Sequence, residues 1–467
     1  MTSADYKGPT NSVTMPDGSR LTIPLDLNLM TPYVLQEQGD WFEAEIHFIR
    51  RWLQPGMQVV DVGANYGVYT SAAASAVGPS GQVWAFEPAQ LPHACLTQSI
   101  KLNHWNHVTL FQIALSDHVG KARLGINSNA ELNSLSQSDG AGEEVELSTL
   151  NAQGKHFSKG IDYLKLDAEG EEIRILSAAS DFFAHHDPLV MFEYKHGSQV
   201  NVGLIDAVRA AGMEIYRLVP GIGCLTRLGE GQNVDDFILN LFGCRKSRAA
   251  QLIQQGFLAD PSHVVGERLL FLDAEKRVSD WMSLRPWSKD VWPDGFPAQH
   301  QKGHELYLCG LAELIVAEDS SKPIQERLHR LDLAIQLLTT ALEQRNSIGR
   351  ALSLARAQAH AGLRNDSVKT LRSIEAIFIK RKNSLGYKSD EFFMPADRRH
   401  DELSARGMDP GLVIQVMVDE PLLERCAFST YFLGPNIVSF LRRIMANPLT
   451  TSPIRIRVET ALQHHCN

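Results

Sequence analysis

The sequence predicts an α/β protein in which a mostly parallel sheet carries helices on both faces and an all-α accessory domain follows. Three observations lead to this prediction. Short apolar runs of strand length alternate with segments of helical periodicity up to about residue 260. After about residue 300 only the helical periodicity continues. The chain has 467 residues, more than one hydrophobic core usually serves.

The expected elements begin at Trp41. A helix is predicted over residues 41–53, because Trp41, Ile46, Ile49 and Trp52 recur at about the helical period. The segment QPG ends this helix, and the apolar run MQVVDVG is typical of a buried strand. By the same criteria, helices are expected at residues 66–78, 91–103, 171–179 and 201–212, and strands at 57–63, 81–88, 108–116, 161–170, 188–195, 214–219 and 235–243. Such alternation indicates βαβ units with right-handed crossovers.

The expected domains are an N-terminal extension over residues 1–40, the α/β domain over 41–260, a packed linker over 261–300 and a helical accessory domain over 301–467. The linker is expected to be irregular and to pack against the first domain, because solvated linkers seldom carry residues such as Trp281, Trp287 and Trp292.

Residues 330–344 and 350–378 are expected to form a helical hairpin. Part of it resembles one tetratricopeptide-type unit, with small and apolar residues near the expected positions at Leu354, Ala355, Gly362, Ser367 and Leu371. Gln358 stands where that unit commonly has an aromatic residue. An ordinary helical domain explains the pattern equally well, because a single unit cannot bury its shared face.

The composition is that of a soluble globular protein, with 44% hydrophobic and 21% charged residues. The net charge of −9 argues against nucleic acid as a partner. The six cysteines form no C-x-x-C pair and are expected to be reduced thiols. Neither a signal peptide nor a membrane-spanning apolar run is recognisable, so a cytoplasmic location is expected.

The segment VVDVGANYG, residues 59–67, has the character of a strand that turns into a helix. Gly63 allows a tight turn, and small Ala64 and Gly67 allow the helix and a ligand to approach closely. Ala64, Asn65 and Tyr66 separate the two glycines, so this is not the G-x-G-x-x-G pattern of dinucleotide sites. Because a ligand binds beyond the carboxyl ends of parallel strands, this turn is the expected cofactor site.

Two acidic residues, Asp61 and Glu87, help to distinguish between S-adenosylmethionine and NAD as the cofactor. Asp61 would repel a dinucleotide pyrophosphate but attract an ammonium group. Glu87, at the end of the next strand, can accept hydrogen bonds from both hydroxyls of a ribose. S-adenosylmethionine has both an ammonium group and a ribose, whereas NAD shares only the ribose. Asp61 therefore distinguishes the two cofactors better than Glu87 does.

Five segments occur in the order DVGANYGVYT, AFEP, ALSDHVGKARL, IDYLKLDAEGEE and MFEYKH. Together they resemble the FkbM-type methyltransferase family over about residues 40–245. This resemblance implies a Rossmann-like class I methyltransferase fold over 41–260 and transfer of a methyl group from S-adenosylmethionine, most often to a hydroxyl oxygen. The cofactor-binding residues expected in these motifs are Asp61, Gly63, Ala64, Asn65, Gly67, Thr70, Glu87, Pro88, Ala114, Leu115, Ser116 and Asp167, with Ala114 to Ser116 near the adenine. Ser99, Asn151 and Ser177 depart from the family's pattern.

Asp167, Glu169 and Glu193 should converge with Asp61, because parallel strands end at one edge of the sheet. Methyl transfer to a hydroxyl requires an aligned oxygen and a group that takes its proton. Glu169 is the first choice for this base or for a substrate holder, and Asp167 is expected beside the methionine end of the cofactor. Glu193 and His196 are second choices.

Other polar residues near these motifs have plainer interpretations. Lys165 points to the opposite side of its strand from Leu164 and Leu166. It is expected either to form a buried ion pair or to have a structural role. Glu171 and Glu172 stand where acids favour the start of a helix. Mg²⁺ or Mn²⁺ held by two or three acids is possible but not favoured, and no metal ligand is assigned. His185 and His186 are expected to be exposed loop residues.

The favoured function is O-methylation of a small-molecule or glycan acceptor, such as a sugar or a secondary metabolite, with S-adenosylmethionine as the methyl donor. The helical domain could bind a protein partner or mediate self-association. One alternative is a nicotinamide-dependent oxidoreductase, which Asp61 and the missing third glycine disfavour. Another is a non-catalytic helical-repeat scaffold, which the intact acidic set disfavours.

Overall fold

The computed structural model describes residues 9–125, 134–136, 142–157, 159–196, 199–229, 234–260, 271–292, 302–380 and 391–466. The chain divides into two compact units. The first unit comprises Met1–Leu218, Arg227–Gln232 and Ile238–Phe257, and the second comprises Val219–Thr226, Asn233–Phe237 and Leu258–Asn467. Among the described helices, none combines the length and apolar character that crossing a membrane would require.

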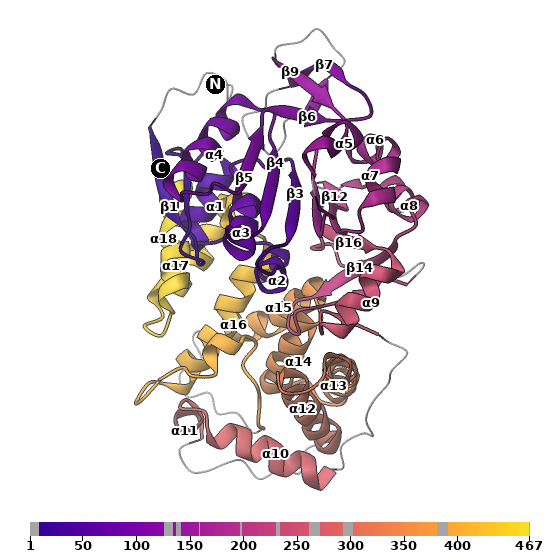
Figure 1. Ribbon diagram of the computed structural model, residues 1–467. Coiled ribbons are helices and arrows are strands. Elements are labelled where there is room, and N and C mark those ends of the chain that lie inside the picture. Colours follow the sequence, from indigo (N-terminus) through magenta and orange to yellow (C-terminus); the bar gives the residue numbers. More distant parts are fainter. Residues whose placement is uncertain are drawn as a thin grey trace. The chain divides into compact units, whose positions relative to one another are not determined.

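The first unit is built on a mostly parallel sheet, whose strand order within this unit is β14-β16-β11-β10-β3-β4-β5 (Figure 1). The strands are β3 (Gln58–Val62), β4 (Gln82–Phe86), β5 (Val108–Phe111), β10 (Tyr163–Leu166), β11 (Leu189–Glu193), β14 (Glu214–Val219) and β16 (Asn240–Cys244). β3 pairs in parallel with β4 and β10, and β16 is antiparallel to β11 and β14. Because the strand order reverses at β3, the carboxyl ends of β3, β4 and β10 border the place where open α/β sheets bind ligands.

Helices flank this sheet, which confirms the predicted fold class (Figure 1). One group contains α1 (Met30–Gln38), α2 (Ala44–Trp52), α3 (Val68–Val77) and α4 (Gln90–Leu102). A second group contains α5 (Leu150–Gln153), α6 (Glu172–Ser177), α7 (Ser180–His185) and α8 (Val202–Ala210), and α9 (Lys246–Gln254) follows β16. All residues of β3 are buried, as expected for a strand covered on both faces.

The strand expected over residues 108–116 is divided at Gln112. β5 pairs with β4 in the main sheet, whereas β6 (Ile113–Leu115) pairs with β9 in a separate sheet of order β6-β9-β7-β8. The other strands of that sheet are β7 (Gly120–Gly125), β8 (Ser134–Ser136) and β9 (Gly142–Ser148). The apolar pattern did not predict β7, because only Leu124 in it is buried.

The N-terminal residues form an antiparallel hairpin of β1 (Thr10–Thr14) and β2 (Arg20–Pro24). Leu21 and Ile23 of β2 are buried, and the Thr22 N–H donates a hydrogen bond of 2.8 Å to Ser99 Oγ in α4. Ser99, which departs from the family pattern, therefore connects the hairpin to α4.

The second unit is mainly helical. Its helices are α10 (Phe271–Ser283), α11 (Ser288–Val291), α12 (His304–Glu318), α13 (Ile324–Gln344), α14 (Ile348–His360), α15 (Arg364–Lys380), α16 (Pro410–Cys426), α17 (Val438–Ala446) and α18 (Ser452–Cys466). The expected segment 350–378 is two helices that separate at Gly362, whose φ is +78°. Leu354, Ala355, Ser367 and Leu371 are buried, but many helical folds share such hairpins, so the tetratricopeptide similarity stays a prediction.

The tryptophan-rich stretch differs from the expected irregular linker, because α10 occupies part of it. Trp287 and Trp292 lie in the hydrophobic core of the second unit. Their ring centroids are 5.0 Å and 5.4 Å from that of Phe393. The expectation that these rings pack against the first domain is therefore replaced by burial within the second unit.

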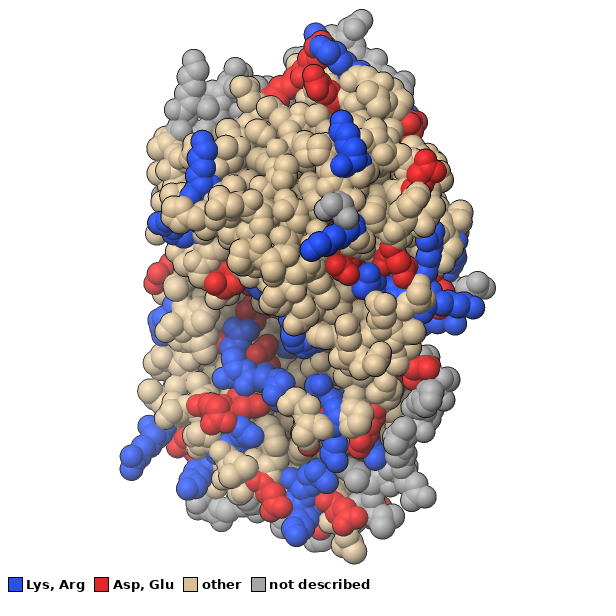
Figure 2. Space-filling model, in the orientation of Figure 1, with Lys and Arg blue, Asp and Glu red and all other residues tan. Residues whose placement is uncertain are grey.

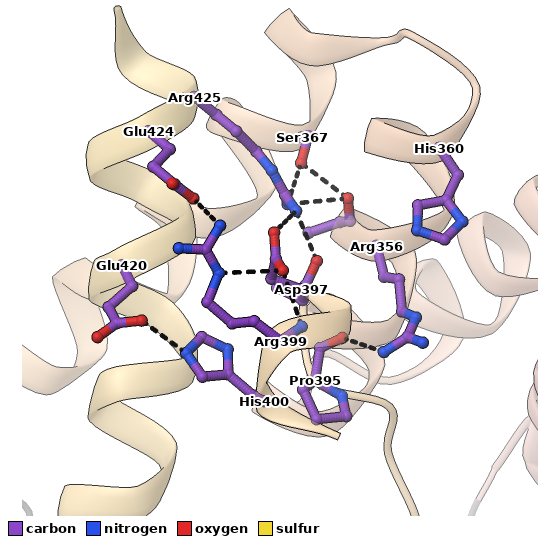
Figure 3. Close-up of polar contacts among 12 residues, drawn as sticks. Arg356, His360, Ser367, Pro395, Asp397, Arg399, His400, Glu420, Glu424 and Arg425 are labelled. Carbon is purple, nitrogen blue, oxygen red and sulfur yellow. Dashed lines mark hydrogen bonds and ion pairs between the residues drawn. The ribbon is translucent and has the colours of Figure 1, made fainter. Parts of the chain in front are cut away.

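Ion pairs run through the interior of the second unit (Figure 3). Arg425 of α16 donates hydrogen bonds to Ser367 Oγ at 3.0 Å and to Asp397 Oδ2 at 3.4 Å. Asp397 also accepts from Arg399 Nε at 3.2 Å, and Arg399 donates to Glu424 at 2.5 Å. These buried and half-buried charges thus have partners of opposite sign, without which their burial would be costly.

Two short segments, Val219–Thr226 and Asn233–Phe237, interrupt the first unit and belong to the second. Val219, Ile222 and Cys224 are part of its hydrophobic core. The Gly221 N–H donates a hydrogen bond of 2.9 Å to the carbonyl oxygen of His360. β15 (Cys224–Arg227) pairs in parallel with β17 (Leu258–Ala259) through Leu225 and Leu258. The chain therefore contributes to the second unit before the first unit is complete.

Candidate active site

The turn after β3 lies against the loop after β10. The N–H groups of Gly63 and Ala64 each donate a hydrogen bond of 3.0 Å to the Phe86 carbonyl oxygen of β4. Gly63 has a φ of +74°, and a Cβ atom there would lie 1.7 Å from the carbonyl oxygen of Asp167. Glycine is therefore required at residue 63 by backbone conformation and by space.

Gly67 makes room for a helix. Its φ is +89°, and a Cβ atom there would lie 2.4 Å from Leu96 Cδ1 in α4. Asn65 between the two glycines also has a left-handed backbone, with a φ of +49°, and its Oδ1 accepts a hydrogen bond from the Tyr66 N–H. The turn thus combines two glycines with an asparagine, the residue type that tolerates this conformation best after glycine.

Glu87 follows β4 and is buried against this turn. Its Oε2 accepts a hydrogen bond of 2.7 Å from the Asn65 N–H, and its Oε1 accepts one of 2.8 Å from the Ala89 N–H. Burial raises the pKa of Glu87 to about 7, although these two N–H groups act in the opposite direction. Pro88 is half-buried beside it. The carboxylate thus holds the turn, and its role in binding a ribose stays a prediction.

Asp61 is almost fully buried in β3 and has partners within the chain. Thr70 Oγ1 in α3 donates a hydrogen bond of 2.5 Å to Asp61 Oδ2, and Lys165 Nζ in β10 lies 3.7 Å from Asp61 Oδ1. Burial raises the pKa of Asp61, and Lys165 and Thr70 oppose this shift. The sequence led us to expect a ligand's ammonium group beside Asp61, and the structure places the ammonium group of Lys165 there. The role of Asp61 in cofactor binding stays a prediction.

Asp167, Glu169 and Glu193 converge, as expected from the ends of parallel strands. One carboxylate oxygen from each lies within 4.8 Å of the others, close enough to hold a metal ion. Glu169 has a φ of +50°, a strained backbone of the kind found at functional sites. Burial raises the pKa of Glu169, and the charges of Asp167 and Glu193 add to this shift. Their catalytic roles and metal binding remain hypotheses.

Three residues at this edge, Glu43, Glu45 and Tyr69, were not predicted from the sequence. Tyr69 in α3 donates a hydrogen bond of 2.5 Å to Glu43 Oε2 at the start of α2. Burial raises the pKa of Glu43, and the charge of Asp167 adds to the shift. Burial and Glu43 also raise the pKa of Glu45 to about 8. Tyr69 lies within the DVGANYGVYT motif and could have been considered, but only the fold brings α2 to this edge.

The residues expected near the adenine lie partly outside the main sheet. Ala114 and Leu115 belong to β6, and Ala114 shares a small apolar cluster with Ala89, two residues beyond Glu87. Ser116 is buried, and its Oγ donates a hydrogen bond of 2.5 Å to Glu171 Oε2. These contacts connect β6 both to the end of β4 and to the start of α6.

Two of the remaining polar residues, Glu172 and Asn151, make hydrogen bonds that stabilise local structure. Glu172 accepts hydrogen bonds from the N–H groups of Ala168 and Gly170 before α6, in accord with a helix-start role. Asn151 Oδ1 accepts a hydrogen bond of 2.8 Å from the Phe182 N–H in α7. His196 lies in β12 (Lys195–His196), which pairs with β13 (Gln199–Val200), and its side chain lies outside the described residues.

The prediction that His185 and His186 are both exposed is correct only for His185. His185 is exposed, but His186 is half-buried, with its ring 4.8 Å from that of Phe182 and 5.9 Å from that of Phe157. Burial lowers the pKa of His186. The pair does not form a metal-binding group in the described part of the chain.

Charge on the surface of the first unit is mixed. On the face drawn in Figure 2, the described lysines and arginines over this unit are interspersed with aspartates and glutamates.

The strand order, the antiparallel β16 and the glycine turn after β3 define a Rossmann-like class I methyltransferase fold. Residues 61–215 match the family model of the methyltransferase FkbM domain. This segment is therefore similar to the methyltransferase FkbM domain, as the sequence motifs indicated.

Individual relatives resemble only part of the chain. The 31-O-demethyl-FK506 methyltransferase FkbM of Streptomyces tacrolimicus is 35% identical over 123 residues, which are 26% of this chain and 46% of that protein. The chain thus spans about half the length of this curated relative. The solved methyltransferase FkbM of Methylobacillus flagellatus is 14% identical, with a TM-score of 0.31 over 46% of this chain and 50% of that one. Fibrillarin of Aeropyrum pernix is 10% identical, with a TM-score of 0.27 over 51% of this chain and 96% of that one.

Proposed function

We propose that the first unit transfers a methyl group from S-adenosylmethionine to a hydroxyl oxygen of a sugar, a glycan or a secondary metabolite. The observation that carries this proposal is that the FkbM-type segment contains the glycine turn, Glu87 and the converging carboxylates of Asp167, Glu169 and Glu193. The name of the Streptomyces relative, 31-O-demethyl-FK506 methyltransferase, refers to an O-demethylated compound, which supports an oxygen acceptor.

The residues of the chain fit this cofactor chemically. Glu87 carries acceptor oxygens suited to the two hydroxyls of a ribose, and Ala114 with Ala89 offers an apolar surface for an adenine. The Asp167 carboxylate suits an ammonium group. S-adenosylmethionine, when bound, supplies an electrophilic methyl group on its sulfonium. The task of the chain is therefore to align an oxygen nucleophile and remove its proton.

Glu169 is the proposed proton acceptor, and Glu193 the proposed second holder of the acceptor hydroxyl. Burial and the neighbouring carboxylates raise the pKa of Glu169 and so favour its protonated form. Positive charge close to Glu169 would favour the ionised form, which alone can accept a proton. Binding of a cationic cofactor and activation of Glu169 are therefore coupled in this proposal.

Two measurements test the proposal. Titration calorimetry with S-adenosylhomocysteine should show one site per chain, with a dissociation constant on the order of micromolar. Mass spectrometry after incubation with isotopically labelled S-adenosylmethionine and a panel of hydroxylated acceptors should detect O-methylated products. No heat and no thermal shift with either nucleoside would contradict cofactor binding, and binding of NADH instead would support the oxidoreductase alternative.

A further inference from the structure

Lys165 is buried at the centre of this edge, although lysine is one of the residues least often buried. It lies in β10 directly opposite Asp61 of β3 in the parallel register. Burial lowers its pKa, but the charges of Asp167 and Asp61 outweigh this effect and raise it, so the ammonium group stays charged. Because a buried charge is costly unless it is paired, its partners indicate what it does.

The ammonium group of Lys165 contacts several separate segments at the edge of the sheet. Nζ donates hydrogen bonds to Asp167 Oδ2 at 2.9 Å and to the Gly63 carbonyl oxygen at 3.1 Å. It lies 3.7 Å from Asp61 Oδ1, and 5.4 Å from the ring centroid of Tyr69 in α3. One cation thus joins the turn after β3, the first turn of α3 and the loop after β10.

We propose that Lys165 is a positioning residue, which holds the Asp167 carboxylate and the Gly63 turn in the arrangement that receives S-adenosylmethionine. This inference rests on the proposed function. The Asp167 side chain is 34% exposed, so packing alone does not fix its orientation. The hydrogen bond from Lys165 fixes it relative to the turn, where Gly63 already touches the Asp167 backbone.

A plainer role would be to neutralise Asp61. Asp61 is almost fully buried, and removal of Lys165 would leave it without a cation, which destabilises a protein strongly whatever the role of Asp167. The two roles can be separated because Asp61 can be neutralised independently. In a D61N background, Lys165 has no Asp61 charge left to compensate, but it still contacts Asp167 and the Gly63 carbonyl.

The test is a double-mutant cycle of the full chain with K165M, D61N and D61N/K165M. The affinity for S-adenosylhomocysteine is measured by calorimetry, kcat and KM for S-adenosylmethionine by product formation, and folding by thermal unfolding. We expect K165M, added to D61N, to lower the affinity at least about tenfold, as for loss of a hydrogen bond to a charged group. We also expect it to raise KM for S-adenosylmethionine more than it lowers kcat.

Two outcomes would overturn the proposal. Equal affinity and KM in D61N and D61N/K165M would show that Lys165 only compensates Asp61. Failure of the charge-balanced D61N/K165M to fold would show that Lys165 is needed for stability rather than for positioning. If the unmutated chain itself did not bind S-adenosylhomocysteine, the proposed function would fail first, and this inference with it.

A matched lysine provides the control. Lys121 in β7 pairs with Glu144 at 2.7 Å, as closely as Lys165 pairs with Asp167, but it is well exposed. K121M should leave affinity, KM and unfolding temperature unchanged within error, because exposed ion pairs contribute little. A loss in K121M as large as the loss in K165M would attribute the effect to overall charge and would contradict the proposal.

Discussion

Among single residues, Glu87 is expected to make the affinity for the cofactor dependent on pH. The folded protein holds its pKa at about 7, and the ionised carboxylate is the form that accepts hydrogen bonds from ribose hydroxyls. Affinity for S-adenosylhomocysteine should therefore rise with pH through about 7 and decrease roughly tenfold from about pH 8 to about pH 6. Calorimetry over this range checks the prediction. The Glu87→Gln variant should bind S-adenosylhomocysteine more weakly than the unmutated protein at about pH 8. Its affinity should change little with pH, because the amide does not titrate.

Glu169→Gln separates cofactor binding from turnover. The amide is nearly the same size but cannot accept a proton, so the affinity for S-adenosylhomocysteine should be kept while kcat falls by about 10²–10⁴-fold. The rate of the unmutated enzyme should rise with pH, because burial and neighbouring carboxylates favour protonation of Glu169 and only its ionised form acts as a base. Retained kcat in Glu169→Gln would exclude Glu169 as the base.

Among the elements, the turn between β3 and α3 requires glycine, because a side chain there would clash with neighbouring atoms. Gly63→Ala should abolish cofactor binding and lower stability, because its Cβ would meet the Asp167 backbone at 1.7 Å. Gly18→Ala, in the turn between β1 and β2, is the matched control, with a φ of +83° and no atom within 4 Å of the added Cβ. It should cost only the left-handed conformation, about 1–2 kcal/mol. Thermal unfolding and calorimetry compare the two variants, and equal losses would show that backbone conformation alone matters at Gly63.

Elements with continuous apolar runs could be predicted from the sequence, and half-exposed ones could not. The residues of β3 are all buried, so a run such as QVVDV indicates a strand without further information. β7 buries only Leu124, and α10 lies in a stretch whose prolines and tryptophans indicate irregular structure. The division between β5 and β6 was missed, because a periodic apolar pattern does not show that the chain changes sheets at Gln112.

The candidate site was predictable to the extent that strand ends determine it. Asp167, Glu169 and Glu193 could be expected together because parallel strands finish at one edge. The pairing of Lys165 with Asp61 needs the register of β10 against β3, which alternation alone does not give. The presence of Glu43 at this site could not be predicted, because the sequence of α2 does not indicate where the helix lies in the fold.

At the scale of the whole molecule, the two units are not consecutive in sequence. Residues 219–226 and 233–237 leave the first unit and complete the second. Phe237 illustrates this, because its ring lies 4.4 Å from the Arg364 guanidinium and 5.3 Å from the Phe428 ring. A boundary near residue 260 follows the end of the strand–helix alternation, but the alternation does not reveal which core these loop residues join.

This interleaving predicts that a protein cut after residue 260 will associate with itself. The cut removes the helices against which Val219, Ile222 and Cys224 are buried, while these residues stay in the protein. Each aliphatic side chain that becomes exposed loses roughly 1.5–3 kcal/mol of burial, and together they leave an apolar patch. Light scattering with size-exclusion chromatography should therefore detect aggregates. The same fragment with Val219→Thr and Ile222→Asn should be more soluble and should bind S-adenosylhomocysteine, because every residue expected to bind the cofactor precedes residue 200. A monomeric, soluble fragment without these substitutions would show that residues 219–226 refold onto the first unit when the second is absent.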